Sequence, residues 1–131
     1  MTRLESDKVT VNKSAEEIYK FLSDFNNFGH LMPEQVGDWQ STPDECSFTI
    51  KGMASLGMKI TERTPNSHIK IVRNGKAPFD FELHVNIDDK GSDCDVQLLF
   101  DADLSPMLKM MASKPLTNFL NLLINRLRTV A

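Results

Sequence analysis

The spacing of apolar residues changes along this chain, and these changes limit the folds it can adopt. From Pro33 to Leu104 apolar residues recur at every second position, which is typical of strands covered on one face. The clearest example is the segment 79–87, in which every odd position is apolar and every even position is polar. After Ser105 apolar residues recur every three or four positions as far as Leu127, which predicts one long amphipathic helix.

The first third of the chain predicts one strand and two helical segments. Residues 3–12 alternate polar and apolar side chains around two valines, which indicates a strand. Ser14 and Glu17 form a capping box, because the Ser14 hydroxyl can accept a hydrogen bond from the Glu17 amide. Apolar residues at spacings of three and four follow, and a second short helical turn ends at Pro33.

Turn signals divide the region after Pro33 into six short strands. They lie at residues 42–44, 52–57, 64–66, 74–76 and 88–91. Asn74-Gly75 is the sharpest of them, since a two-residue hairpin turn needs positive φ at both central positions. Connections this short favour an antiparallel meander.

The last helix has its own start signal and one interruption. Ser105-Pro106 provides a capping serine followed by proline at the first helical position. Pro115 removes a backbone donor inside the helix, so a kink is expected near residues 112–114.

Composition bounds the class of protein. The 131 residues suit a single domain, 1–131, with 40% hydrophobic and 25% charged residues. A net charge of −3 gives no basic surface for nucleic acid and disfavours anionic membranes. Residues 1–8 carry charges where a signal peptide needs an apolar run, and no stretch reaches the length of a membrane span. A cytoplasmic protein without integral membrane association is expected.

The two cysteines, Cys46 and Cys94, lie far apart and outside any CxxC motif. A disulfide framework or a zinc site would need more ligands at closer spacing, so buried thiols in a reducing compartment are expected. The three histidines do not stand at metal-ligand spacing such as HExxH, and no glycine-rich phosphate loop is present. Neither a metal nor another cofactor is therefore expected. Strand parity places His68 and His84 on the outer face of the sheet.

The order strand, two helices, six strands and long helix resembles the helix-grip fold of the START-like superfamily, also known as Bet v 1-like or SRPBCC proteins. The segment 9–24 resembles the opening of small bacterial members, and residues 25–33 resemble their second helix. The superfamily includes birch-pollen-allergen-like proteins, polyketide cyclases and dehydratases, and lipid-transfer domains. The resemblance implies an α+β fold in which a curved antiparallel sheet of about seven strands wraps around the C-terminal helix. It also implies an apolar ligand between the two.

The alternation of side chains along the strands, and their spacing on the helix, predict which residues line that ligand site. The side chains expected to face the space between sheet and helix are Phe48, Ile50, Met58, Ile60, Ile71, Phe79, Phe81, Leu83, Val85, Leu98, Phe100, Leu108, Met111 and Phe119. The same side chains can instead pack against one another as a solid core. Met53 and Leu56, assigned to a hairpin tip, are candidates for a lid or a partner contact.

Two charged residues continue the inward parity of their strands. Glu62 follows the series of Met58 and Ile60, and Arg73 follows Ile69 and Ile71. Either is expected to reach the mouth of the cavity or to lie in solvent at a strand end. Glu62 in an apolar pocket would have a raised pKa, as a general acid or base needs. These two residues are the candidates for catalysis.

Three functions follow from these patterns. The first is a carrier or sensor of a small lipid-like or polycyclic ligand. The second is a cyclase- or dehydratase-like enzyme that uses Glu62 or Arg73. The third is a protein-interaction module with a filled core, acting through its sheet surface or its edges. The oligomeric state stays open, although an edge strand at 36–41 would offer backbone groups for pairing.

Overall fold

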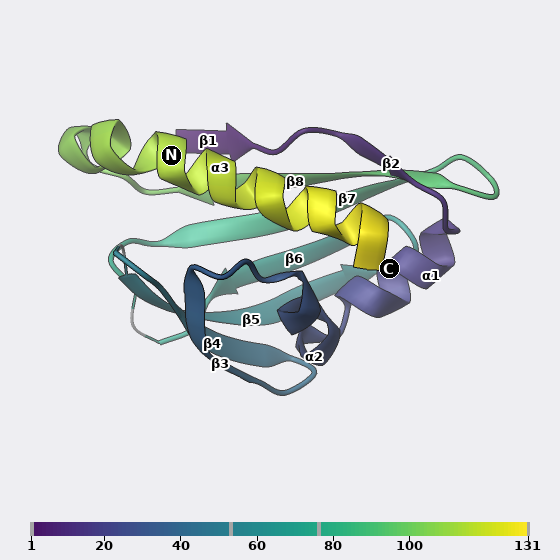
Figure 1. Ribbon diagram of the computed structural model, residues 1–131, viewed down its shortest axis with the longest axis horizontal. Coiled ribbons are helices and arrows are strands. Elements are labelled where there is room, and N and C mark those ends of the chain that lie inside the picture. The colour runs from purple at the N-terminus through teal and green to yellow at the C-terminus, as the bar shows by residue number, and fades with distance from the viewer. Residues whose placement is uncertain (1, 53, 76, 131) are drawn as a thin grey trace.

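The computed structural model describes residues 2–52, 54–75 and 77–130 (Figure 1). Within them, eight strands form one antiparallel sheet against which a long helix lies. The elements in chain order are β1 (Thr2–Glu5), β2 (Val9–Val11), α1 (Ala15–Leu22), α2 (Phe25–Phe28), the 3-10 turn η1 (Gly29–Leu31), β3 (Val36–Ser41), β4 (Glu45–Ile50), β5 (Ala54–Thr64), β6 (His68–Arg73), β7 (Phe81–Asp89), β8 (Cys94–Ala102) and α3 (Pro106–Val130).

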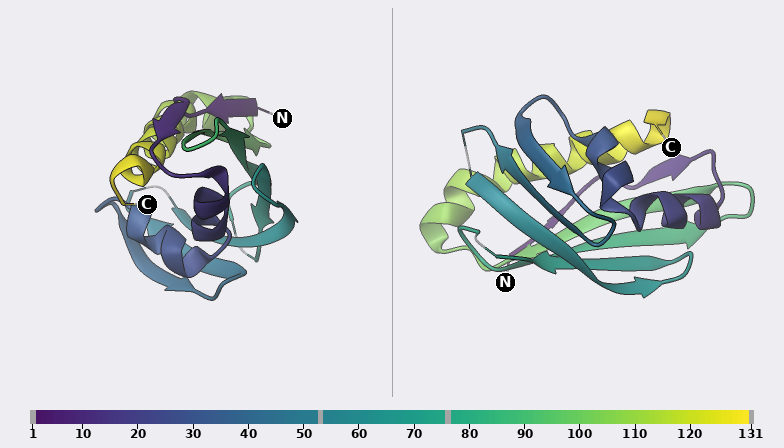
Figure 2. Two further views of the ribbon diagram at one scale, coloured as in Figure 1. Left: turned by 90° about the vertical axis from the view of Figure 1, so that its right-hand side faces the viewer. Right: turned by 90° about the horizontal axis from the view of Figure 1, so that it is seen from below.

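The sheet has the strand order β1-β8-β7-β6-β5-β4-β3, and β2 also pairs with β8. Strands β3 to β8 are therefore the predicted meander, with β3 at one edge. Seen end-on in Figure 2 (left), the sheet curves into an open arc with α3 along its open side. Helix α3 packs against β1, β2, β8 and η1, whereas α1 packs against β6 and β7. The sequence prediction of an α+β fold with a curved antiparallel sheet and a long C-terminal helix is confirmed.

The predicted N-terminal strand is divided in two, which explains why eight strands stand where about seven were expected. Ser6 lies at the break and is buried. Its backbone N–H donates to the Leu98 carbonyl at 2.9 Å, and its hydroxyl accepts from the Leu98 N–H at 2.9 Å. The serine side chain thus completes the hydrogen bonding of β8 where the pairing register shifts by one residue between β1 and β2.

Both predicted helix starts are present. The Glu17 N–H donates to the Ser14 hydroxyl at 3.2 Å, and the Leu108 N–H donates to the Ser105 hydroxyl at 3.2 Å. Helix α3 continues through Pro115, and Figure 1 shows its first turns, drawn in green, set at an angle to the later ones. Across residues 2–52, 54–75 and 77–130, none of the helices combines the length and apolarity that crossing a bilayer requires.

Both cysteines are free and buried, as predicted, with exposed fractions of 5% for Cys46 and 0% for Cys94. Burial raises the pKa of the Cys46 thiol to about 12 and that of Cys94 to about 11, from an ordinary value of 9.0. In each native thiol the proton is therefore retained to higher pH than in the unfolded chain.

We expect both thiols to be unreactive in the folded protein. At pH 8 the native chain should react with 5,5′-dithiobis(2-nitrobenzoate) far more slowly than the chain unfolded in urea, in which both thiols are accessible. The thiols of the unfolded chain ionise from about pH 9, while the native thiols stay protonated. The free energy of unfolding therefore falls as the pH rises above that value. Rapid reaction of one thiol in the native protein would contradict the buried positions.

Candidate ligand-binding site

The space between the sheet and α3 is largely filled by side chains. It contains a cavity of about 30 Å³, which is room for little more than one water molecule. Its lining is entirely apolar and comprises Phe28, Met32, Phe48, Ile50, Leu56, Met58, Phe81, Leu83, Phe100, Leu116, Phe119, Leu120 and Leu123. In this conformation the interior does not accommodate a lipid or a polycyclic molecule.

A much larger space opens at the surface, between the first half of α3 and the end of β4 with the turn that follows it. This groove has a volume of about 530 Å³ and is lined by Gln35, Ile50, Lys51, Gly52, Leu108, Met111, Ala112, Pro115, Asn118 and Phe119. Ile50 and Phe119 line both the groove and the interior cavity. These two side chains therefore form the boundary between them.

Exposed methionines lie beside the groove on the first turns of α3. Met107, Met110 and Met111 have exposed fractions of 71%, 86% and 68%. Large apolar side chains in such a cluster usually mark a surface that contacts a ligand or another molecule. Lys51 adds a cation to the groove lining, so one end of the groove suits an anionic or hydroxyl-bearing group.

The structure separates the fourteen residues predicted for the ligand site into three groups. Seven line the interior cavity: Phe48, Ile50, Met58, Phe81, Leu83, Phe100 and Phe119. Leu108 and Met111 line the groove, as Ile50 and Phe119 also do. The other five are packed in the core and line neither space: Ile60, Ile71, Phe79, Val85 and Leu98. Helix α1 covers the region of β6 and β7 that contains Ile71 and Val85.

Sequence reasoning missed several lining residues. Phe28 and Met32 reach the cavity from α2 and the segment after η1, a region treated only as a short helical turn. The sequence predicts Leu56 at a hairpin tip, but it lies in β5 and is buried with an exposed fraction of 6%. The companion assignment, Met53, lies outside the described residues.

Of the two positions expected for Glu62, the cavity mouth and solvent at a strand end, the structure shows the second. The register between β5 and β6 shifts between Ile60 and Glu62, so a bulge turns Glu62 to the outer face. There it lies opposite Lys70, whose ammonium is 3.7 Å from the Glu62 carboxylate. The Glu62 side chain is 62% exposed, so it lies in solvent rather than in an apolar pocket.

Arg73 also does not enter the cavity. It lies at the end of β6, where its guanidinium pairs with the Asp80 carboxylate at 2.8 Å. Its side chain is 41% exposed, and it lines neither the cavity nor the groove. The two catalytic candidates are thus surface residues with ion-pair partners.

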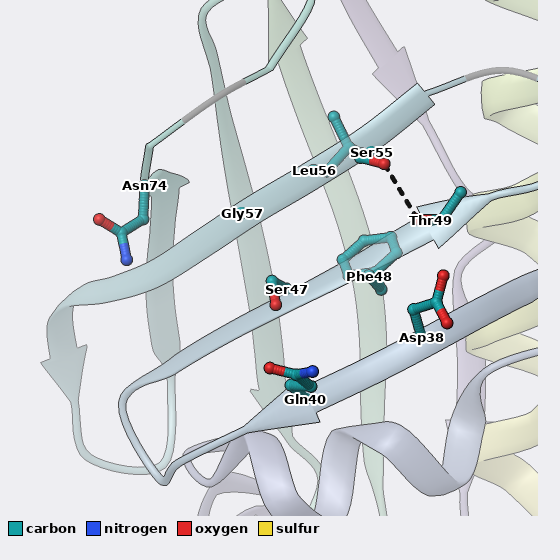
Figure 3. Close-up of a pocket in the computed structure, with 9 residues that line it drawn as sticks. All are labelled: Asp38, Gln40, Ser47, Phe48, Thr49, Ser55, Leu56, Gly57 and Asn74. Carbon is teal, nitrogen blue, oxygen red and sulfur yellow. Dashed lines mark hydrogen bonds between the residues drawn. The ribbon is translucent and has the colours of Figure 1, made fainter.

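A polar depression of about 310 Å³ lies over β3, β4 and β5 (Figure 3). The Thr49 and Ser55 hydroxyls hydrogen-bond to each other across it at 2.9 Å. Its polar lining residues are Asp38, Gln40, Ser47, Thr49, Ser55 and Asn74. These side chains are mainly exposed, which makes the depression a solvated sheet surface rather than a ligand pocket.

Among the residues that the structure describes, one group of three side chains comes close enough to share a metal ion. It comprises Glu82, His84 and Asp101. His84 and His68 lie on the outer face, as predicted, so this group is separate from the cavity and the groove.

Solved structures of low sequence identity share this architecture. A START superfamily protein from Mycobacterium smegmatis aligns at 19% identity with a TM-score of 0.71, over 97% of this chain and 94% of that one. The protein XoxI from Bacillus cereus aligns at 10% identity with a TM-score of 0.78, over 98% and 94%. Norcoclaurine synthase from Thalictrum flavum, in complex with dopamine and hydroxybenzaldehyde, aligns at 13% identity with a TM-score of 0.72, over 98% and 84%.

These similarities show that the chain has the START-like, or Bet v 1-like, helix-grip fold that the sequence predicted. No model of a protein family matches the sequence, and no curated protein matches it significantly. The fold leaves the function to be argued from the site itself.

Proposed function

We propose that this protein binds a small apolar ligand, lipid-like or polycyclic, in the groove beside α3 and acts as its carrier or sensor. The observation that carries this proposal is the apolar groove of about 530 Å³, which lies within the usual range of roughly 300–1,000 Å³ for small-molecule sites. The interior cavity is an extension of the site that a ligand reaches when Phe119 changes rotamer, because Phe119 lines both spaces.

The groove lining favours an amphipathic ligand. Gln35, Lys51 and Asn118 are its polar side chains, and the remaining lining is apolar apart from the Gly52 backbone. A ligand with a hydrocarbon or ring body and one anionic or hydroxyl-bearing end matches this distribution. The dopamine and hydroxybenzaldehyde in norcoclaurine synthase show that a protein of this fold takes ring compounds with polar substituents.

The lining also favours binding over catalysis. A cyclase- or dehydratase-like reaction needs an acid or base within reach of the substrate. Among the described residues, neither a carboxylate nor an imidazole lines the groove or the cavity, and the exposed Lys51 is the one ionisable side chain in their lining. A carrier or sensor needs only the apolar surface and an entrance.

Filling the groove tests this proposal. Ala112 lines the groove, so Ala112→Phe is expected to weaken binding of the probe 1-anilinonaphthalene-8-sulfonate by about tenfold or more. Asn125→Phe places the same side chain on an exposed position of α3 outside the groove and should leave binding unchanged. Fluorescence titration of both variants measures the difference.

The same titration distinguishes ligand binding in the groove from the remaining alternative, a protein-interaction module with a filled core. The small interior favours that alternative, since a cavity of about 30 Å³ holds no ligand of useful size. Binding of the probe that Ala112→Phe leaves intact, or no binding by the unmodified protein, would support the filled-core module and remove the groove proposal.

A further inference from the structure

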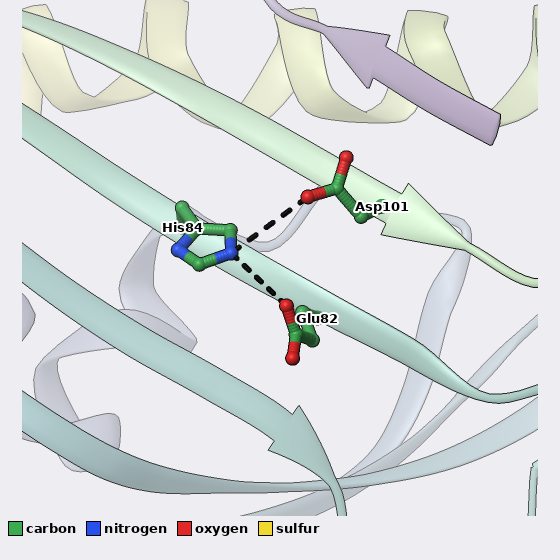
Figure 4. A group of neighbouring side chains, drawn as sticks. All are labelled: Glu82, His84 and Asp101. Carbon is green, nitrogen blue, oxygen red and sulfur yellow. Dashed lines mark hydrogen bonds and ion pairs between the residues drawn. The ribbon is translucent and has the colours of Figure 1, made fainter. Parts of the chain in front are cut away.

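Three potential metal ligands converge on the outer face of the sheet. Glu82 and Asp101 are direct cross-strand partners on β7 and β8, and His84 follows Glu82 by two residues on the same face. The His84 Nε2 atom lies 3.4 Å from Glu82 Oε2 and 3.8 Å from Asp101 Oδ2 (Figure 4). Their side chains are 37%, 18% and 16% exposed for Glu82, His84 and Asp101, so the cluster is partly sheltered and still open to solvent.

Each of the three side chains is also held by a residue on its far side. His84 Nδ1 lies 2.9 Å from His68 Nε2, within hydrogen-bond distance. The Arg3 guanidinium donates to Asp101 Oδ1 at 2.7 Å and to Oδ2 at 2.9 Å.

The two carboxylate oxygens of Glu82 also face different partners. Its Oε1 lies 3.5 Å from the Lys70 ammonium, while its Oε2 faces His84. Metal ligands are commonly oriented by such outer hydrogen bonds.

The tautomer of His84 decides what joins the inner atoms: with Nε2 protonated, His84 donates to the Glu82 carboxylate at 3.4 Å, and with Nδ1 protonated a cation can occupy the space between them. When His84 Nδ1 donates to His68, the lone pair of His84 Nε2 points toward two carboxylate oxygens, and acceptor atoms facing one another repel. The carboxylates of Glu82, Asp101 and neighbouring Glu62 also outnumber the cations Arg3 and Lys70. The cluster is therefore net negative and suits a positive ion.

The two separations measured from His84 are close to those of a tetrahedral transition-metal site. Zinc bonds of about 2.0–2.2 Å to nitrogen and oxygen set tetrahedral ligand atoms about 3.3–3.6 Å apart. The observed separations of 3.4 and 3.8 Å from His84 Nε2 need a closure of only a few tenths of an ångström. An imidazole ligand favours Zn²⁺ over Mg²⁺, which prefers an octahedron of oxygen atoms.

We propose that Glu82, His84 and Asp101 bind a divalent transition-metal ion of the Zn²⁺ type. The fourth coordination position faces solvent and is taken by water. Asp101 Oδ2 accepts a hydrogen bond from Arg3 through one lone pair and coordinates the ion through the other, since each carboxylate oxygen has two. The site lies outside the groove, so a test of metal binding here does not depend on whether the groove binds a ligand.

Isothermal titration of the full chain with ZnCl₂ at pH 7.5 tests the proposal. The expected result is one Zn²⁺ per chain, with Mg²⁺ giving no heat of binding. His84→Ala removes the central ligand and should weaken Zn²⁺ binding more than tenfold, while His68→Phe removes an orienting partner and should weaken it about 10- to 100-fold. His30→Ala is the matched control, because His30 is exposed and outside the cluster.

Two further readouts keep the test decisive if a variant folds poorly. Circular dichroism checks that each variant has the native secondary structure. In the unmodified protein, Co²⁺ should give the visible absorption bands of a tetrahedral site, which Zn²⁺ then removes. The proposal is overturned if the unmodified protein binds no Zn²⁺, if His84→Ala leaves binding intact, or if His30→Ala weakens it equally.

Discussion

Replacing Gly57 with alanine is expected to lower the free energy of unfolding by about 3 kcal/mol. Gly57 is buried in the first half of β5, and a Cβ atom there would collide with the backbone carbonyl oxygen of Asn74. The Asn74 N–H in turn donates to the Gly57 carbonyl at 2.9 Å, so the two backbones are held together by this bond. To relieve the collision, the two backbone segments must move apart, and this hydrogen bond must break.

Urea denaturation of Gly57→Ala and Gly37→Ala measures this effect. Gly37 lies in the edge strand β3, where a Cβ atom would be 3.9 Å from its nearest neighbour, the Lys51 side chain. The Gly37 substitution is expected to change stability by no more than about 0.5 kcal/mol. Equal effects of the two substitutions would show that the close approach at Gly57 is not a constraint.

Gly57 also shows where the sequence pattern is ambiguous. A glycine five positions after another indicates a loop, so the sequence predicts a hairpin tip at residues 52–57. In the structure, β5 begins at Ala54 and Gly57 permits a backbone contact with Asn74, a residue seventeen positions away. A close approach between distant segments leaves no periodic signal, so the sequence alone could not separate this glycine from one in a turn.

Features set by local patterns were predicted well. The Ser14 and Ser105 caps, the period of two in β7 and β8, and the apolar stripe of α3 each depend on residues within a few positions. Together they specify the meander and the final helix, which is why the fold was predictable.

The site was less predictable because it depends on pairing register and on side-chain volume. The bulge near Glu62 reverses strand parity, and the sequence of β5 does not mark it. Whether aromatic side chains such as Phe81 and Phe100, stacked with ring centroids 5.1 Å apart, leave room for a ligand depends on their packing.

The proposed metal cluster illustrates the same limit. Glu82 and Asp101 are nineteen residues apart, and only the register of β7 against β8 makes them direct neighbours. Motifs such as HExxH find ligands that lie on one helix, so they do not detect ligands placed on adjacent strands.

Phe119→Ala is expected to join the groove to the interior cavity. Phe119 is 8% exposed and lines both spaces, so its removal opens the interior to the surface. Loss of the buried ring should lower the free energy of unfolding by about 3–5 kcal/mol. At the same time, affinity for 1-anilinonaphthalene-8-sulfonate should rise on the order of tenfold, because a naphthyl ring can enter the enlarged site.

Phe25→Ala is the matched control for this variant. Phe25 has an exposed fraction of 0% and lines neither the cavity nor the groove, so it should cost similar stability without admitting the probe. Urea denaturation with and without the probe separates the two effects, since a ligand that binds only the folded state raises its stability. Stabilisation of Phe119→Ala alone is the expected result. If the probe stabilises both variants equally, or neither, Phe119 does not separate the groove from the interior.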